Sequence, residues 1–171
     1  LKDPRVGGAQ IGITNPGGLR AELGKGDVTF AQANAVLPFA NNLWTSTVTG
    51  AQLKEALEQQ WQRTEAGAVP STPFLALGLS KNVRYTFDST RAEGDRITAI
   101  RVDGKLVKVS DSFRIGAPSF LIEGGDNFRA FKKASDARDS GLLDRDAWMD
   151  YLTAHQGLMP DFAKRGVEVQ N

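Results

Sequence analysis

The sequence AQIGITNPGGLR, residues 9–20, joins a strand pattern to a turn rich in groups that can bind a ligand. Residues 9–14 alternate apolar with small or polar side chains, which predicts a β-strand, and Pro16-Gly17-Gly18 predicts an abrupt turn after it. Glycine has no Cβ, so a ligand can approach the backbone closely at such a turn. Asn15 and Arg20 add an amide and a guanidinium. Taken alone, the stretch is more typical of an ordinary strand-ending turn that carries a surface arginine.

Two later segments strengthen the ligand interpretation. In AVLPFANN, residues 35–42, Pro38 sets the chain direction directly before Phe39. In FLIEGGDNF, residues 120–128, a pair of glycines between two aromatic residues is followed by Asp126. Each segment by itself fits core packing plus a turn, because a single phenylalanine is far more often a core residue than a stacking platform. The combination of all three segments is more specific.

Together the three segments resemble the C-terminal, substrate-binding domain of the 5′-nucleotidase and UDP-sugar hydrolase family. That family's pattern runs from an Asn-Gly-Gly-x-x-Arg-like loop, through a Pro-Phe-x-Asn turn, to a Phe-x-x-x-Gly-Gly-Asp-x-Phe loop, in this order and near these spacings. The resemblance covers almost the whole chain. It implies an α+β (mixed α/β) fold, layered as an α/β/β/α-type sandwich with mixed sheets. It also implies that residues 1–171 form one C-terminal domain, truncated at its N-terminus and separated from an N-terminal metallophosphatase domain.

The same resemblance assigns roles to individual residues. Phe39 and Phe120 match two platforms that stack on a nucleobase, and stacking is worth about 1–3 kcal/mol per base whatever the base. Asp126 matches a carboxylate that accepts hydrogen bonds from the ribose hydroxyls. Asn15 matches a residue at the base or ribose edge, and Arg20 a cation near the phosphate. The predicted substrate-binding residues are Asn15, Gly17, Gly18, Arg20, Phe39, Phe120, Gly125 and Asp126.

The chain departs from the family pattern at two positions of these loops. Pro16 stands where relatives commonly have glycine, which removes one N–H donor. Asn127 replaces a common glycine after the aspartate. Relatives also use an arginine upstream, near a Leu-Gly-Asn-Leu-like segment, but the residues around Arg5 do not match that segment and no role is transferred.

Catalysis in this family takes place at a two-metal site on the separate N-terminal domain. The present chain contains one histidine and no cysteine. His155 falls at the end of a predicted helix, where an imidazolium suits the negative end of the dipole. Asp144, Asp146 and Asp150 are interpreted as a cap and a solvated helix face rather than as metal ligands. We therefore expect no catalytic residue, metal or cofactor in this chain, and two divalent metal ions on the absent domain.

Composition and charge limit the possible partners. With 171 residues, 40% of them hydrophobic, the chain is large enough for one substantial core. A formal net charge of +1 provides no long-range attraction to a nucleic-acid polymer or an anionic membrane. No apolar run reaches membrane-spanning length. The absence of cysteine fits export and the cytosol equally well. An extracytoplasmic location follows from the family resemblance alone.

Hydrophobic periodicity and turn signals predict the remaining elements. A short helical segment begins within residues 27–30, and residues 43–48 form a strand. A capping-box signal at residues 49–52 predicts a helix through about Arg63, with Leu53, Ala56, Leu57 and Trp61 on its core face. Residues 65–71 form a loop. Further strands are predicted at residues 83–87, 97–102, 106–109, 112–117 and 167–169, with a hairpin turn at Asp103-Gly104 and a helix near residues 144–156.

The function implied by the resemblance is capture of the nucleoside half of a nucleotide, with its phosphate presented to metals on the other domain. Nucleotide catabolism or salvage would be the process. Two alternatives remain open. The parent protein could act on a 2′,3′-cyclic nucleotide, a dinucleotide or a nucleotide sugar, or this domain could be a non-catalytic nucleotide-binding or envelope module.

Overall fold

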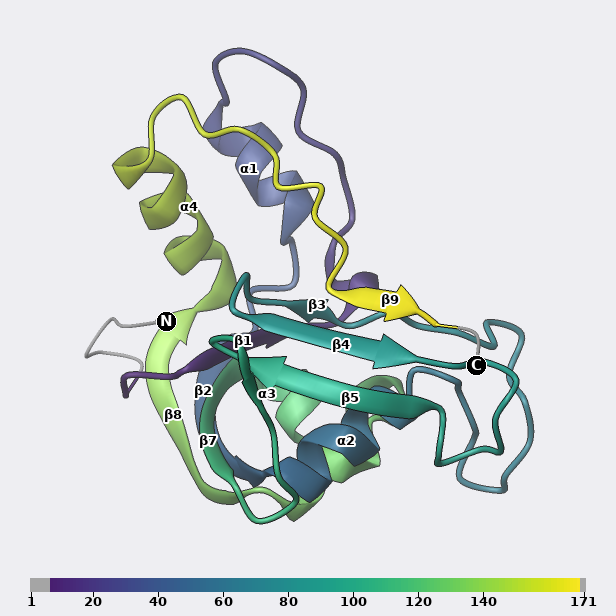
Figure 1. Ribbon diagram of the computed structural model, residues 1–171. Helices are drawn as coiled ribbons and strands as arrows, with labels where there is room; N and C mark the ends of the chain where they lie inside the picture. The colour runs from purple at the N-terminus through teal and green to yellow at the C-terminus, as the bar shows by residue number, and fades with distance from the viewer. Residues whose placement is uncertain (1–6, 170–171) are drawn as a thin grey trace.

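Two mixed β-sheets form the framework of the molecule (Figure 1). The structure, a computed structural model, describes residues 7–169. One sheet has the strand order β3-β1-β7-β2-β8 and the other β6-β5-β4-β9. The strands are β1 Ile11–Thr14, β2 Asn42–Thr49, β3 Gly78–Leu79, β4 Val83–Phe87, β5 Ile97–Val102, β6 Lys105–Leu106, β7 Ser112–Pro118, β8 Ser135–Leu143 and β9 Gly166–Glu168.

Both sheets combine parallel and antiparallel neighbours. Strand β1 runs parallel to β7, and β4 runs parallel to β9, whereas all other paired strands in the two sheets are antiparallel. The predicted α+β fold with mixed sheets is confirmed. The helices are α1 Phe30–Val36, α2 Gly50–Glu58, α3 Ser119–Ile122 and α4 Asp144–Ala154, with short 3-10 turns η2 Pro16–Gly18, η3 Gly125–Asn127 and η4 Arg129–Lys133.

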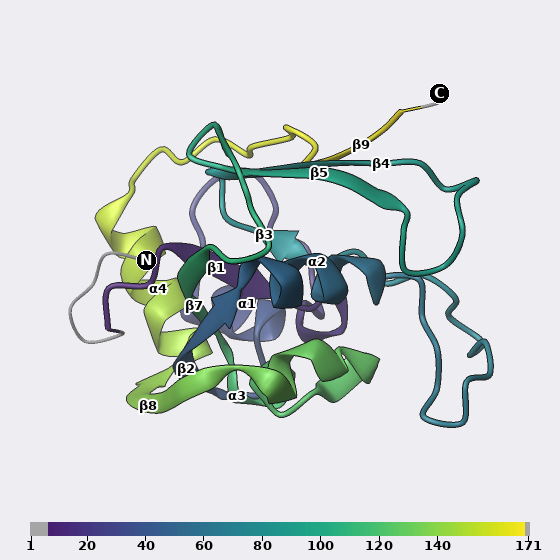
Figure 2. The same ribbon diagram turned by 60° about the horizontal axis from the view of Figure 1, so that its bottom comes forward.

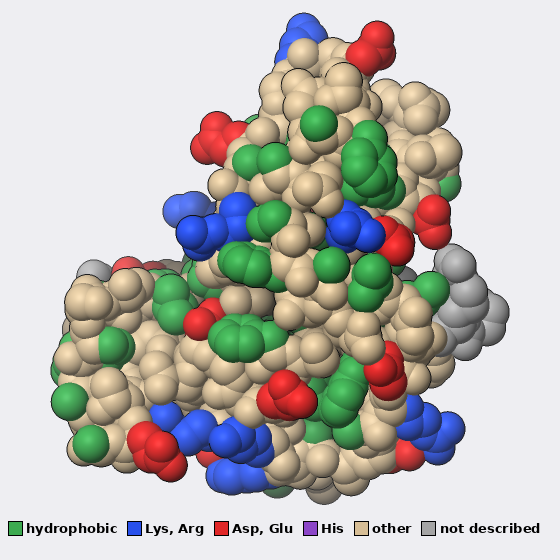
Figure 3. All heavy atoms as spheres, turned by 180° about the vertical axis from the view of Figure 1, so that it is seen from behind, with side chains coloured by type: hydrophobic (Ala, Val, Ile, Leu, Met, Phe, Trp, Pro, Cys, Tyr) green, Lys and Arg blue, Asp and Glu red, His purple; other side chains and the backbone are tan. Residues whose placement is uncertain are grey.

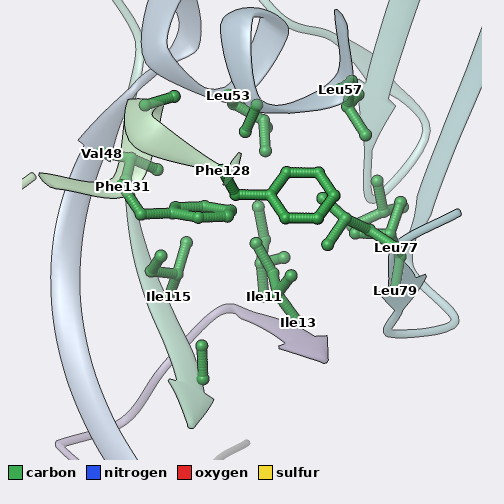
Figure 4. Close-up of a cluster of buried hydrophobic side chains, with 14 of the residues drawn as sticks. Ile11, Ile13, Val48, Leu53, Leu57, Leu77, Leu79, Ile115, Phe128 and Phe131 are labelled. Carbon is green, nitrogen blue, oxygen red and sulfur yellow. The ribbon is translucent and has the colours of Figure 1, made fainter. Parts of the chain in front are cut away.

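The sheets and helices are layered around a shared core. Figure 2 shows the four-stranded sheet as an upper layer, with β1 and α2 beneath it. Helix α2 contacts β2, β5 and η4, while α1 and α4 contact each other at a different side of the molecule. In the core, Phe128 and Phe131 lie among side chains from β1, α2 and β7 (Figure 4). Because Phe128 and Phe131 are 0% and 1% exposed, the segment after the Gly-Gly-Asp loop is firmly anchored.

Strand β1 has the alternation predicted from the sequence. Ile11 and Ile13 are buried in the core, whereas Gly12 and Thr14 point to the opposite face. The strand therefore delivers the residue after it, Asn15, to the edge of the core. The predicted start of α1 is also confirmed, since Thr29 and Gln32 form a capping box at its first turn.

The prediction for α2 is right at its start and wrong at its end. Thr49 and Gln52 form the capping box, and Leu53 and Leu57 lie in the core. However, the helix ends at Glu58 rather than continuing to Arg63, and Trp61 pairs with Phe74 in an isolated β-bridge. The chain leaves the helix because buried glutamine side chains after Glu58 hydrogen-bond to backbone groups of the turn.

The second sheet matches the prediction except at one strand. Strands β4 and β5 have the predicted bounds, and the turn between β5 and β6 has positive φ at both Asp103 and Gly104. The predicted strand at residues 106–109 is wrong, because β6 is limited to Lys105–Leu106. Beyond it the chain turns back at Lys108–Asp111 and its carbonyls accept hydrogen bonds from the first N–H groups of α2.

The C-terminal part contains the largest unpredicted element. Strand β8, Ser135–Leu143, pairs antiparallel with β2 and contains register shifts. The predicted helix near residues 144–156 is confirmed as α4, and the predicted last strand is β9, displaced by one residue. Arg5, for which no role is predicted, lies outside the described residues.

On the face shown in Figure 3, basic side chains occur in small groups with acidic side chains close by. An upper lobe projects above the rest of the molecule on this face, in the region where Figure 1 shows α1 and α4.

Among the helices of residues 7–169, none is both long enough and apolar enough to span a bilayer.

Candidate functional site

The first predicted loop is joined directly to the third. Asn15 follows β1 and is 5% exposed, and its Nδ2 donates a 2.7 Å hydrogen bond to Oδ2 of Asp126, 111 residues later in the chain. Pro16–Gly18 form the 3-10 turn η2. A Cβ built on Gly17 would lie 3.5 Å from Asp126 Oδ2, so the loop backbone runs alongside this carboxylate. The structure thus brings together an amide, a glycine backbone and a carboxylate.

The Gly-Gly-Asp loop has an unusual backbone conformation. Gly124, Asp126 and Asn127 have φ angles of 81°, 50° and 60°, and two of these residues carry a side chain. The left-handed region is costly for residues other than glycine, although asparagine and aspartate tolerate it best. Such strain persists only where surrounding contacts impose it, and it is concentrated at functional sites. The loop is therefore held in this shape by its neighbours.

Phe120 and Gly125 are in close contact. Phe120 is the second residue of the short helix α3 and is 42% exposed, so its ring is available to solvent. A Cβ at position 125 would overlap the Phe120 ring. Only glycine at this position allows the ring to lie against the loop that carries Asp126.

Phe39 and Arg20 form a second contact pair. Phe39 follows α1 and is 59% exposed, and the next residue, Ala40, has a positive φ of 50°. Arg20 Cζ lies 5.9 Å from the centroid of the Phe39 ring, within the range of a cation–π interaction. Arg20 Nη1 donates a 3.4 Å hydrogen bond to the carbonyl of Gly17, and its backbone N–H is held by Val36. Arg20 therefore connects the second segment to the first.

All eight predicted residues belong to one continuous set of contacts. From Phe39 the set passes through Arg20 and Gly17 to Asp126, which Asn15 holds in place. Gly18 packs against the Asn15 side chain, since a Cβ on this glycine would lie 3.0 Å from Asn15 Oδ1. Gly125, adjacent to Asp126, brings in Phe120. Three segments that are distant in the sequence meet at one place.

Gln62 and Gln59, to which no role is assigned from the sequence, hydrogen-bond to the third loop and the residues after it. Gln62 is 1% exposed and its Oε1 accepts a 2.9 Å hydrogen bond from Asn127 Nδ2. Gln59 Oε1 accepts a 3.0 Å bond from the backbone N–H of Ala130. Nothing local in the sequence identifies these contacts, because both glutamines lie in a stretch that reads as the continuation of α2.

Asn41 supports the second segment in a similar way. Its Nδ2 donates to Asp144 Oδ2 at 3.1 Å, and its carbonyl accepts from the Asp144 N–H at 2.9 Å. The Pro-Phe-x-Asn pattern contained Asn41, but no role was assigned to it. Asp144, one of three aspartates interpreted as a cap and a solvated helix face, does not fit either role, because the N-cap of α4 is Leu143 and Asp144 is only 7% exposed. Its carboxylate is bonded to Asn41 and to the N–H of Arg145.

The interior beneath the loops contains a further buried amide. Gln60 is 0% exposed; its Nε2 donates to the Leu57 carbonyl, and its Oε1 accepts from the Leu77 N–H and from the Tyr85 hydroxyl. Burial raises the pKa of Tyr85, opposed by this hydrogen bond. The phenol consequently stays protonated and remains a donor at neutral pH.

Most of the chain matches a known protein family. Residues 5–133 match the family described as 5′-nucleotidase, C-terminal domain. The chain belongs to this family. The predicted resemblance is confirmed, and strand β8, helix α4 and strand β9 lie beyond the matched residues.

Several relatives of this family are similar over most of the chain. The trifunctional nucleotide phosphoesterase protein YfkN of Bacillus subtilis is 33% identical over 156 residues, which are 88% of this chain and 10% of YfkN. The NAD 5′-nucleotidase of Haemophilus influenzae is 30% identical over 84% of this chain and 25% of its own length. The chain therefore spans a quarter or less of these two relatives.

Solved structures contain the same fold. The 5′-nucleotidase precursor from Thermus thermophilus has a TM-score of 0.79 and 28% identity, covering 95% of this chain and 32% of that one. The sulfate thiohydrolase SoxB of the same genus has a TM-score of 0.59 at 16% identity, over 95% of this chain and 28% of SoxB. The second similarity concerns the fold alone.

The described residues contain no cluster of candidate metal ligands. Within residues 7–169 there is no group of three or more histidine, aspartate and glutamate side chains that could hold a metal ion. His155 lies at the C-terminal end of α4, where its Nδ1 is 2.8 Å from the Tyr151 carbonyl oxygen and its ring stacks on Tyr151. The prediction of a histidine at a helix end is confirmed.

A groove in another part of the molecule is separate from the eight predicted residues. It has a volume of about 730 Å³ and lies between α4 and the five-stranded sheet. Gly12, Gly116, Ala147 and Tyr151 are among its lining residues, and none of the eight predicted residues is. The groove and the three-loop site are therefore different features.

Proposed function

We propose that this chain is the nucleotide-binding domain of a 5′-nucleotidase-type phosphoesterase. In this proposal Phe39 and Phe120 stack on the nucleobase, Asp126 and Asn15 bind the nucleoside through its hydroxyl groups and polar edge, and Arg20 provides positive charge for the phosphate. Gly17, Gly18 and Gly125 allow the backbone to approach the ligand. The chemistry itself takes place at two divalent metal ions on an N-terminal domain of the same polypeptide.

The observation that carries the proposal is the set of contacts that joins three distant segments around Asp126. Two large phenylalanine rings in this set of contacts, Phe39 and Phe120, stay 59% and 42% exposed. Burying such a ring is worth about 1.5–3 kcal/mol, so leaving both exposed at one site sacrifices stability that a core position would provide. A flat aromatic ligand with a polar sugar would cover the rings and use the carboxylate at the same time.

The division between a binding domain and a catalytic domain has a mechanistic advantage. Contacts to the base and ribose lie far from the reacting phosphorus, and they can position the phosphate on the metals without changing the chemistry. Binding energy from non-reacting parts of a substrate can be used in this way to raise the rate. We also infer an extracytoplasmic location, because a relative 33% identical over 72% of this chain is the cell wall protein Lmo0130 of Listeria monocytogenes.

A titration of the chain with AMP, adenosine and ribose 5-phosphate, without added metal, tests the proposal. We expect saturable binding of AMP and adenosine at micromolar to millimolar concentration and much weaker binding of the sugar phosphate. Phe39→Ala and Phe120→Ala should each weaken adenosine binding by about 5- to 150-fold, the equivalent of 1–3 kcal/mol per stack. Phe162→Ala is the matched control, because Phe162 is 88% exposed and belongs to none of the three segments.

The same variants should be made in the longest available form of the protein. Turnover of AMP should fall much more than turnover of a generic phosphate ester that has no base. Equal losses on both substrates would contradict the stacking roles. Adenosine binding that survives both phenylalanine substitutions would contradict the proposed site as a whole.

The ester on which the parent protein acts is a separate question from base recognition. The names of the relatives include a trifunctional nucleotide phosphoesterase, an NAD 5′-nucleotidase and an apyrase, so related domains occur with different reactions. We propose a 5′-nucleotide as the substrate, and a panel of AMP, NAD, 2′,3′-cyclic AMP and UDP-glucose would distinguish the alternatives.

A further inference from the structure

Gln62 is a buried glutamine whose side chain links the end of α2 to the loop that carries Asp126. Its Nε2 donates a 2.8 Å hydrogen bond to the Gln59 carbonyl, and its Oε1 accepts a 2.9 Å bond from Asn127 Nδ2. A backbone carbonyl can only accept, so Nε2 must face Gln59 and Oε1 must face Asn127. The orientation of this amide, and of its partner on the loop, is therefore determined.

Asn127 is the residue through which Gln62 acts on the loop. Its φ of 60° lies in the left-handed region that glycine adopts freely. Asparagine tolerates this conformation, and unlike glycine it adds a side chain that can be anchored. The bond to Gln62 thus supplies a fixed point where a glycine would leave the backbone free to move.

Asp126 is supported by two amide side chains from different segments of the chain, Asn15 after β1 and Gln62 after α2. Asn15 holds its Oδ2 directly, and the Gln62–Asn127 bond fixes the next residue of the backbone. With φ of 50° and ψ of 34°, Asp126 is itself in a strained conformation that needs such support. A shift of its carboxylate by a fraction of an ångström would misalign hydrogen bonds to a diol.

We propose that Gln62 is a positioning residue for Asp126, acting through Asn127, and that it sets the preference of this site for a ribose with free 2′ and 3′ hydroxyls. The inference rests on the proposed function of Asp126. It also explains why α2 ends at Glu58: the residues after it are used as hydrogen-bonding supports for the loop and the core rather than as further helical turns.

Gln60 provides a matched control two residues away. It is as deeply buried as Gln62 and its side chain makes three hydrogen bonds, but these reach Leu57, Leu77 and Tyr85 rather than the loop. Replacing either glutamine with methionine removes a buried amide of similar volume. Loss of stability is therefore expected in both variants, whereas an effect on ribose recognition is expected only for Gln62.

The test compares the affinity of the chain for adenosine with its affinity for 2′,3′-dideoxyadenosine. Hydrogen bonds to a charged carboxylate should make wild type bind adenosine roughly 10- to 150-fold more tightly, and Asp126→Asn should remove most of this ratio. We expect Gln62→Met and Asn127→Gly each to lower the ratio about 3- to 10-fold. Gln60→Met should lower the melting temperature and leave the ratio unchanged. The double variant Gln62→Met, Asn127→Gly should have the same ratio as either of its two single variants, since each substitution removes the same Gln62–Asn127 bond.

The outcomes separate this inference from the function on which it rests. Wild type that fails to bind adenosine, or that binds both ligands equally, overturns the proposed role of Asp126 and this inference with it. A wild-type preference that Asp126→Asn removes but Gln62→Met and Asn127→Gly retain overturns the Gln62 role alone. An equal loss in Gln60→Met also overturns it, because the effect would then be a general loosening of the core. If Gln62→Met does not fold, Asn127→Gly decides, since glycine adopts the left-handed conformation without strain.

Discussion

At the scale of single residues, the contact between Gly125 and Phe120 leads to a selective prediction. A Cβ in Gly125→Ala would overlap the Phe120 ring, but this ring is 42% exposed and can swing into solvent. Folding should therefore change little, while the ring leaves the position in which it could stack. We expect adenosine affinity to fall by about 5- to 150-fold with a melting temperature close to that of wild type.

Gly24→Ala is the control for this substitution, because a Cβ on Gly24 meets no atom within 4 Å. Calorimetric titration and thermal unfolding of both variants measure the two effects separately. Normal adenosine affinity in Gly125→Ala would show that Phe120 takes no part in binding. The resemblance to a family pattern selected eight residues that the structure brings into contact. Gln62 and Asn41 were not among them, because their roles depend on which backbone the fold places beside them.

At the scale of elements, the N-terminus of α2 predicts an unusual response to a helix-favouring substitution. Glycine to alanine in a helix ordinarily stabilises by up to about 1 kcal/mol. At Gly50 the added Cβ would overlap the Lys108 carbonyl, in the turn whose Val109 and Asp111 carbonyls accept hydrogen bonds from the first N–H groups of α2. We expect Gly50→Ala to destabilise the protein by roughly 1–3 kcal/mol, as overpacking does.

Urea unfolding of Gly50→Ala measures this change, with Ala51→Gly as the control on the exposed side of the same turn. The control should lose no more than about 1 kcal/mol, from helix propensity alone. A Gly50→Ala protein as stable as wild type would mean that the turn at Lys108–Asp111 adjusts without cost. Such an outcome would contradict the tight docking of α2 on that turn.

Elements with a strong local signal were predicted well, and those that depend on tertiary pairing were not. Strands β4 and β5 combine apolar alternation with a two-residue turn, so their bounds could be read from the sequence. Strand β8 has the sequence SDARDSGLL and is mostly exposed, which resembles a loop. It becomes a strand only because β2 offers an unpaired edge. The end of α2 was missed for a related reason, since its glutamines find partners in distant loops.

At the scale of the whole molecule, two aspartates with lowered pKa lie close to the edges of the two sheets. The Gly141 N–H and the Asn42 side chain hold the pKa of Asp139, in β8, below its usual range. The Arg165 side chain and the Ala163 N–H do the same for the pKa of Asp161, just before β9. A lowered folded-state pKa means that this stabilisation is complete above the unfolded pKa, near 4, and is lost as the pH falls through the folded value.

Both edges should therefore loosen when the pH falls below about 4, before the core is affected. We expect the melting temperature to fall with acid, and to fall less steeply in a variant that carries both Asp139→Asn and Asp161→Asn. Hydrogen exchange at β8 and β9 should accelerate first, and that at β1 and β7 last. The same acid dependence in wild type and the double variant would assign the loss to other carboxylates.

The position of β1 between β3 and β7 has a consequence for how the chain is made. Its partner β3 pairs at Leu79 and its partner β7 at Ile115, while β1 itself is at Ile11–Thr14, so roughly 100 residues separate it from the parallel strand beside it. At about 5–20 residues per second, a ribosome needs roughly 5–20 seconds to cover that interval. Until β3 is made, Ile11 and Ile13 have no partner strand, and the parallel partner β7 follows only at the end of the interval. Burial of β1 against its parallel neighbour therefore waits until β7 has been made, and Asn15 meets Asp126 only after that.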